Sequence, residues 1–109
     1  VEGPPQGDLL VVGWGGSYGA IAAAVQRAQG KGRGVAHLHL RHLNPLPGNL
    51  GEVMDRFKQI LVPEINLGQL SLMLKARFVK PLISYNKVQG LPFAAEEVLN
   101  KIDEILETR

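Results

Sequence analysis

The fold is decided by residues 8–19, which read DLLVVGWGGSYG. Residues 9–12 are all apolar, and this lack of alternation is typical of a strand that helices cover on both faces. Four glycines follow, at positions 13, 15, 16 and 19. Gly19 and the alanines after it are small enough to let a helix lie close against the sheet. We therefore expect a buried strand, a glycine-rich turn and a helix.

The glycine-rich turn resembles loops that hold a phosphate against backbone N–H groups at a helix N-terminus. Gly13 and Gly15 fit the first two positions of the dinucleotide-binding fingerprint, but Tyr18 occupies the third. About 20 residues further on, no carboxylate is present to bind a ribose. A tight turn with close helix packing is the favoured interpretation. A nucleotide- or CoA-binding module that uses the turn from Gly13 to Gly19 and the nearby Arg41 is the alternative.

Ser17 lies in the sequence GGSYG, which matches the G-x-S-x-G pattern of a nucleophile elbow. The hydrolase triad needs an acid and then a histidine later in the chain, yet the last histidine, His42, precedes every acid of the later strands. This order excludes an esterase, so we predict that Ser17 caps the helix.

Strands and helices alternate along the whole chain, which predicts a three-layer α/β/α domain with a mainly parallel sheet. Strands are expected at 8–13, 35–40, 59–64 and 81–85, in the order 2-1-3-4, and helices at about 18–29, 50–57, 69–78 and 94–107. Pro63 removes a ladder donor, which suggests that pairing stops near it. The last helix has the clearest apolar stripe, and acids crowd its surface.

Composition indicates one ordinary globular domain of 109 residues with a net charge of +2. Residues 1–7, rich in proline and glycine, are expected to be a linker or truncated end, and residues 8–109 the domain. Neither a membrane span nor a signal peptide is expected. The cations are dispersed, which disfavours nucleic acid. The absence of cysteine excludes thiolate sites and fits a cytoplasmic protein.

Two groups of polar residues are candidate sites. His37 and His39 are two apart on a strand and so share a face, with His42 following, but no neighbouring carboxylate or thiol completes a zinc site. We therefore expect hydrogen-bonded histidines in the core or at its rim. Residues 64–70, EINLGQL, place a carboxylate and amides at the carboxyl end of a strand, where open α/β sheets bind ligands. Turn chemistry with capping explains this segment equally well.

Four motifs together resemble one family: GWGGSYGAI, HLHLRHLNPLP, PEINLGQL and NKVQGLPF. They are similar to the C-terminal domain of the alpha subunit of 2-oxoglutarate (2-oxoacid):ferredoxin oxidoreductases. The resemblance implies a fold like the C-terminal domain of transketolase. It also implies an antiparallel edge strand before the first strand, which we expect to be absent or residual here.

The family converts a 2-oxoacid and coenzyme A to acyl-CoA and CO2 while reducing ferredoxin, or runs the reverse reaction. The resemblance implies that thiamine diphosphate, Mg and an iron–sulfur cluster belong to the full complex, with no cofactor in this chain. It implies as partners the rest of the alpha subunit and the beta subunit, with ferredoxin and CoA for the full enzyme. We expect the isolated domain to be non-catalytic, to bind neither nucleic acid nor membrane, and to serve in subunit assembly.

The turns after the strands are expected to bring one set of polar and aromatic residues to a single rim. Tryptophan, tyrosine and arginine are the usual anchors of protein interfaces, so this rim is the predicted subunit interface. Its members are Trp14, Ser17, Tyr18, Arg41, His42, Asn44, Glu64, Asn66, Gln69, Asn86 and Gln89.

Overall fold

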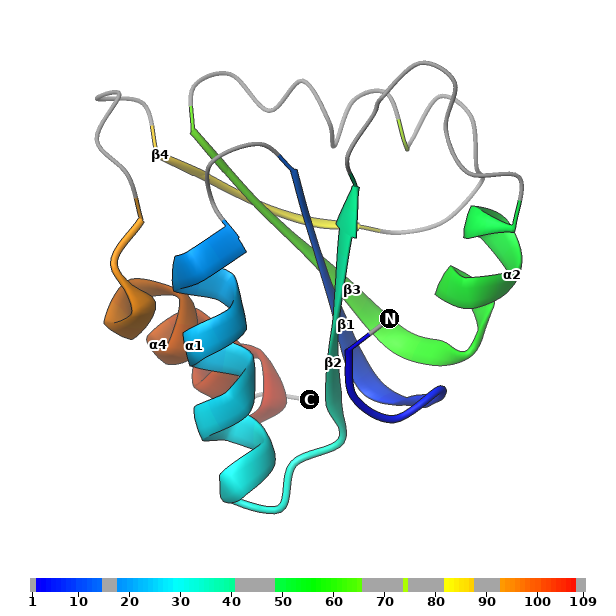
Figure 1. Ribbon diagram of the computed structural model, residues 1–109, viewed down its shortest axis with the longest axis horizontal. Helices are drawn as coiled ribbons and strands as arrows, with labels where there is room; N and C mark the ends of the chain where they lie inside the picture. The colour runs from blue at the N-terminus through cyan, green and yellow to red at the C-terminus, as the bar shows by residue number, and fades with distance from the viewer. Residues whose placement is uncertain are drawn as a thin grey trace.

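The computed structural model describes residues 2–14, 18–40, 49–65, 74, 82–87 and 93–107. In this part of the chain, one parallel sheet has the order β2-β1-β3-β4 (Figure 1). The strands are β1 (Gly7–Trp14), β2 (Val35–Leu40), β3 (Phe57–Ile65) and β4 (Ile83–Lys87). Both the parallel α/β fold and the order 2-1-3-4 predicted from the sequence are confirmed, and β3 lies directly beside β1.

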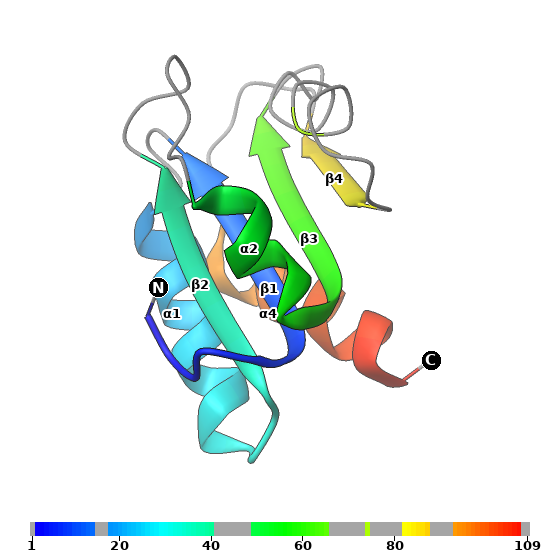
Figure 2. The same cartoon turned by 90° about the vertical axis from the view of Figure 1, so that its right-hand side faces the viewer.

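Helices cover both faces of the sheet. Helices α1 (Tyr18–Gly30) and α4 (Ala95–Glu107) pack on one face, and the short helix α2 (Leu50–Asp55) packs on the other. Figure 2 shows α2 in front of the sheet with α1 and α4 behind it. Of the helix predicted at 69–78, the structure describes Leu74, which is helical and buried.

Strand β1 supplies side chains to both hydrophobic cores. Leu9 and Val11 belong to the core beneath α1 and α4, whereas Leu10 and Val12 belong to the core beneath α2. All four side chains are completely buried. Because successive residues of a strand point to opposite faces, a strand buried on both faces has no polar position along its length.

Helix α4 is held by an apolar stripe and begins with a capping contact. Val98 and Ile102 are fully buried, and Ile105 and Leu106 nearly so. The Ala94 backbone N–H donates to Glu97 Oε1 over 2.9 Å, which satisfies one donor at the helix N-terminus. The predicted span of 94–107 therefore differs from the observed helix by one residue.

The ends of the later strands differ from the prediction. Strand β3 extends to Ile65 and pairs with β4 through Pro63, so pairing does not stop at the proline. Only its pairing with β1 ends earlier, at Leu61. Proline lacks a backbone N–H and so removes one hydrogen-bond donor from one side of the strand. Pairing on the side that faces β4 continues past it. Strand β4 lies two residues later than predicted, which places Asn86 in the strand rather than in the following loop.

An antiparallel contact precedes β1. Glu2 forms an isolated antiparallel bridge with His37, at the outer edge of β2. A residual antiparallel pairing at the sheet edge is therefore present, limited to this single residue pair in the part of the chain that is described.

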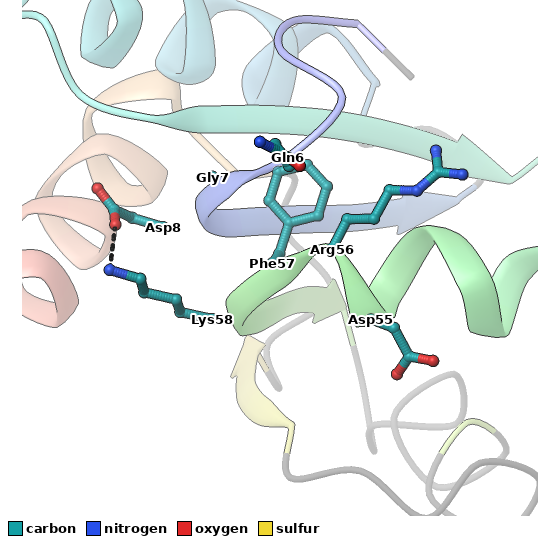
Figure 3. Close-up of a pocket in the computed structure, with 7 residues that line it drawn as sticks. All are labelled: Gln6, Gly7, Asp8, Asp55, Arg56, Phe57 and Lys58. Carbon is teal, nitrogen blue, oxygen red and sulfur yellow. Dashed lines mark ion pairs between the residues drawn. The ribbon is translucent and has the colours of Figure 1, made fainter.

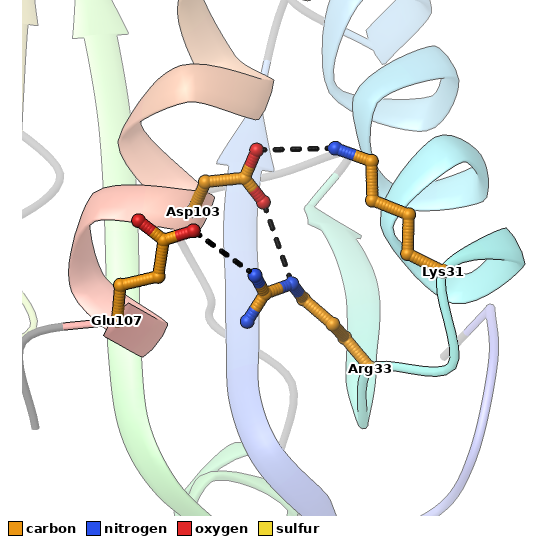
Figure 4. Close-up of polar contacts among 4 residues, drawn as sticks. All are labelled: Lys31, Arg33, Asp103 and Glu107. Atoms are coloured by element: carbon orange, nitrogen blue, oxygen red, sulfur yellow. Dashed lines mark hydrogen bonds and ion pairs between the residues drawn. The ribbon is translucent and has the colours of Figure 1, made fainter.

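Two acids of α4 form ion pairs with the turn that follows α1 (Figure 4). Lys31 Nζ lies 3.2 Å from Asp103 Oδ2, and Arg33 Nε lies 3.4 Å from Asp103 Oδ1. Arg33 Nη2 also lies 3.4 Å from Glu107 Oε1. Part of the acidic surface predicted for the last helix is thus used inside the domain. These groups are partly exposed to solvent, so each pair contributes little to stability and mainly fixes the turn against the helix.

Gly32 ends α1 in a left-handed conformation, with φ at +81°. The Gly32 N–H donates to the Gln29 carbonyl and the Arg33 N–H to the Ala28 carbonyl, which is the hydrogen-bond pattern of a Schellman motif. The turn therefore requires glycine at position 32. Gly30, two residues earlier, is helical, and a Cβ added there would meet no atom within 4 Å.

These two glycines form a matched pair for a stability test. Gly32→Ala should lower the free energy of unfolding by about 1–2 kcal/mol, because alanine is strained in the left-handed region. Gly30→Ala should be neutral or raise it by up to about 1 kcal/mol, because alanine is the better helix former. Urea unfolding monitored by circular dichroism measures both values. Equal effects of the two substitutions would contradict the assignment of Gly32 as the helix-ending residue.

Candidate functional site

Two of the predicted rim residues lie on the surface beside the end of β1. Trp14 is the last residue of β1 and is 36% exposed, and Tyr18 is the first residue of α1 and is 43% exposed. Within the described residues, these are the large hydrophobic side chains with the greatest exposure. The positions of both side chains follow from the order of the elements, because β1 ends at Trp14 and α1 begins at Tyr18.

Tyr18 lies at the centre of a small polar and aromatic group, which we call the Tyr18 cluster: Glu2, Tyr18, His37 and His39. The Tyr18 hydroxyl donates to the Glu2 carboxylate, at 2.7 Å from Oε1 and 2.8 Å from Oε2. This hydrogen bond raises the pKa of the Tyr18 hydroxyl. The Tyr18 ring centroid lies 5.2 Å from that of His37 and 5.1 Å from that of His39. The cluster therefore joins the N-terminal segment, α1 and β2.

The two histidines share one face of the sheet, as the sequence predicts. Their ring centroids are 5.8 Å apart, at an angle of 80°. The prediction that both make hydrogen bonds is wrong for His37, because neither of its ring nitrogens has a hydrogen-bond partner among the residues that the structure describes. His37 is 1% exposed, and its Nδ1 lies 3.4 Å from Glu2 Oε2. The N-terminal segment lies over the His37 side chain. The sequence pattern does not predict that this segment contacts β2.

Burial lowers the pKa of His37 from 6.5 to about 4. The Glu2 carboxylate acts in the opposite direction, and His39 acts in the same direction as burial. The imidazole is consequently neutral near pH 7. In the described part of the chain, no three histidine, cysteine or acidic residues are arranged to hold a metal ion.

Gly19 does not pack against any other part of the chain that the structure describes. A Cβ added at Gly19 would meet no atom within 4 Å, which differs from the expectation that this glycine allows close contact with the sheet. The close approach of α1 depends on Ala24 and Ala28, which are completely buried. The surface at Gly19 is therefore open backbone beside the exposed ring of Tyr18.

The remaining predicted rim residues separate into three groups. Glu64 lies in β3 and is 3% exposed, so its carboxylate does not face solvent in this chain. Asn86 lies in β4 and pairs with Glu64. The others lie outside the described residues: Ser17, Arg41, His42, Asn44, Asn66, Gln69 and Gln89. The centre of the glycine-rich turn, residues 15–17, also lies outside them.

A surface hollow of about 580 Å³ lies at the opposite edge of the sheet, where β1 and β3 begin (Figure 3). Asp8 and Lys58 form an ion pair across it at 3.5 Å, and the buried Phe57 lies beside them. The amino ends of parallel strands are not where open α/β sheets bind ligands. None of the predicted site residues lines the hollow. Its lining carries both acidic and basic side chains, so it does not favour a ligand of one charge.

Glu2 is the member of the Tyr18 cluster that sequence reasoning missed. It lies in the segment predicted to be a linker, 16 residues before Tyr18 and 35 before His37. No local periodicity connects positions so far apart. The only indication in the sequence is the antiparallel edge strand that the family resemblance implies at this point in the chain.

No helix in the described part of the chain is long and apolar enough to span a membrane. No family model matches the chain.

Two curated proteins and one solved structure show what the chain is similar to. It is 49% identical over 96 residues to 2-oxoglutarate oxidoreductase subunit KorA of Mycobacterium tuberculosis, covering 86% of this chain. It is 30% identical over 111 residues to 2-oxoacid:ferredoxin oxidoreductase 2, subunit alpha, of Aeropyrum pernix, covering 99% of this chain. The chain spans 15% and 17% of the lengths of these relatives.

The solved structure is the 2-oxoglutarate:ferredoxin oxidoreductase from Magnetococcus marinus, with 2-oxoglutarate, coenzyme A and succinyl-CoA bound. It matches 95% of this chain and 18% of its own chain, with a TM-score of 0.87 and 32% sequence identity. Fold and sequence agree over nearly the same residues. The chain is therefore homologous to one domain of the alpha subunit of 2-oxoglutarate and 2-oxoacid:ferredoxin oxidoreductases.

Proposed function

We propose that this chain is a non-catalytic structural and subunit-assembly domain of a 2-oxoacid:ferredoxin oxidoreductase, with 2-oxoglutarate as the substrate. The full enzyme would convert the 2-oxoacid and CoA to acyl-CoA and CO2 and reduce ferredoxin. The observation that carries the proposal is the exposure of Trp14 and Tyr18 in a domain whose relatives are several times longer. An exposed aromatic pair is what a domain presents to a neighbouring protein surface.

The surroundings of the two aromatic side chains support a docking role. Trp14 and Tyr18 flank the end of β1, and the open backbone at Gly19 leaves room for a neighbour to approach closely. Tyrosine and tryptophan contribute large contact areas with few rotatable bonds, so burying them costs little conformational entropy. The Tyr18 ring is already oriented by His37 and His39, which reduces that cost further.

The cofactors of the proposed reaction would be held outside this chain. Iron–sulfur clusters are bound mainly by cysteine thiolates, and this chain contains no cysteine. Thiamine diphosphate and Mg would bind in the rest of the complex, between the other parts of the alpha subunit and the beta subunit. The domain would act on that site indirectly, by holding the neighbouring domains in position.

The interface is tested by substituting its aromatic residue in the enzyme that contains this chain. Trp14→Ala should weaken association of the subunits by about 10- to 100-fold, since loss of a buried anchor typically costs about 2 kcal/mol or more. The charge-reversing Arg41→Glu should act in the same direction. Subunit association is measured by sedimentation velocity across a concentration series, together with thiamine content.

The matched control is Asn100→Ala, which changes an exposed residue of α4 away from the rim. It should leave association and cofactor content unchanged. Glu64 is unsuitable for this test because it is buried, and its removal would disturb the core. Normal association and normal thiamine content in the Trp14→Ala enzyme would show that the rim is ordinary solvent-facing surface.

A second candidate is a nucleotide- or CoA-binding module that uses the turn from Gly13 to Gly19 and Arg41. The run of glycines after a buried strand favours it, and the Magnetococcus marinus enzyme has coenzyme A bound. Calorimetric titration of the purified chain with NAD, ATP and CoA distinguishes the two candidates. We expect no binding, because the dinucleotide fingerprint is incomplete. Micromolar affinity for any of the three ligands would favour this second candidate.

A further inference from the structure

The N-terminal segment lies across the outer edge of β2, where Glu2 is hydrogen-bonded to the strand and Gly3 packs closely against Gln29 and Val35. The Glu2 N–H donates to the His37 carbonyl over 2.7 Å, and the His37 N–H donates to the Glu2 carbonyl over 2.9 Å. The Glu2 carboxylate also accepts the hydrogen bond from the Tyr18 hydroxyl. From there the segment runs on to β1, which begins at Gly7. Residues 2–6, which we call the clasp, are therefore held by two backbone hydrogen bonds and one side-chain hydrogen bond at Glu2.

His37 lies directly beneath this attachment. A cavity of about 80 Å³ adjoins its ring, lined by Glu2 and Gly3 of the clasp, by His37 and by four residues of α1. Gln29 of α1 uses its Nε2 to donate to the Val35 carbonyl at 2.9 Å and so does not serve His37. The imidazole is almost completely buried, and within the described part of the chain neither of its nitrogens has a hydrogen-bond partner. The Glu2 carboxylate lies 3.4 Å from His37 Nδ1 but is itself half-exposed, so its attraction offsets only part of the cost of burying a charge on the ring. A proton on His37 therefore destabilises the closed arrangement.

We propose that the clasp is a proton-responsive closure: it lies across β2 while His37 is neutral and detaches from the strand when His37 takes up a proton. Detachment would expose the backbone edge of β2 at His37 and release the Tyr18 hydroxyl from Glu2. The inference does not depend on the proposed function, since every contact that carries it lies within this chain.

The direction of the effect follows from proton linkage. In the closed form, burial holds the pKa of His37 at about 4, whereas a histidine in water has an ordinary pKa of about 6.5. Between these two values the detached form binds more protons than the closed form, so lowering the pH favours detachment. At pH values well above 6.5 both forms are neutral and the equilibrium no longer changes with pH.

The charged and titratable neighbours of His37 come from each element packed against it. The Glu2 carboxylate of the clasp raises the pKa of His37 and so opposes the effect of burial. His39 on β2 and the amino terminus lower it, and the Tyr18 hydroxyl on α1 is uncharged. Burial is the largest influence, so the sign of the linkage is set by exclusion of water rather than by any neighbouring charge.

Amide hydrogen exchange of the isotope-labelled 109-residue chain measures the equilibrium directly. The His37 N–H is protected by the Glu2 carbonyl, so its protection factor reports detachment. A shift from a pKa of about 6.5 to about 4 predicts that this protection falls about thirtyfold between pH 7.5 and pH 5. The Val12 N–H of β1 reports global opening and should keep its protection over the same range, since β1 lies inside the sheet.

Two substitutions provide matched controls on one face of β2. His37→Gln should abolish the pH dependence of the protection at residue 37, whereas His39→Gln should retain it, because His39 is the less buried of the pair. Tyr18→Phe should lower protection at every pH by removing the hydroxyl that binds Glu2, while leaving the ratio between pH 7.5 and pH 5 unchanged. A direct NMR titration of the His37 ring should give a pKa close to 4.

Three results would overturn the proposal. The first is protection at His37 that does not change between pH 7.5 and pH 5. The second is a parallel loss of protection at Val12, which would mean that the whole domain opens. The third is an ordinary pKa near 6.5 for His37 in the wild-type chain, a measurement that stands even where His37→Gln does not fold.

Discussion

Burial of β1 on both faces is the constraint on which the rest of the structure depends. Its side chains alternate between two hydrophobic cores, so helices must cover each face, and the chain must cross over between strands to supply them. The same constraint confines polar chemistry to the ends of the strand. Trp14 and the start of α1 therefore lie at the surface just after the buried stretch of β1, residues 9–12, which contains no polar side chain.

Much of this architecture could be predicted because it depends on strong local patterns. The apolar run of β1 and the stripe of α4 both predict buried elements, and the alternation of strands and helices predicts a parallel sheet. The ends of β3 and β4 could not be predicted. Pairing past Pro63 depends on whether the missing backbone N–H of the proline faces β1 or β4, which the sequence does not tell. Glu64 looks like a rim residue in sequence, but its side chain is buried in the structure.

The surface site was predictable in part. Trp14 and Tyr18 could be placed at the rim from the end of one strand and the start of the next helix. The Tyr18 cluster could not, because Glu2 reaches Tyr18 and His37 only through folding of a segment without periodic pattern. Gly19 is a related case: the sequence predicts that it packs against the sheet, whereas no described residue lies within 4 Å of a Cβ placed there. Glycine in a sequence permits several conformations and contacts, and only the fold selects among them.

The use of α4 in the core beneath α1 has a consequence for synthesis on the ribosome. Val98, Ile102, Ile105 and Leu106 complete that core, yet they follow the sheet strands by many residues in the chain. While β1, β2 and β3 emerge, one face of the nascent sheet has only α1 to cover it, and α4 is the last of the described elements to be made. Long-range contacts of this kind slow folding, and the uncovered apolar face is prone to misassociation in the interval. The apolar core beneath α1 is therefore complete only once α4 has been made and has docked.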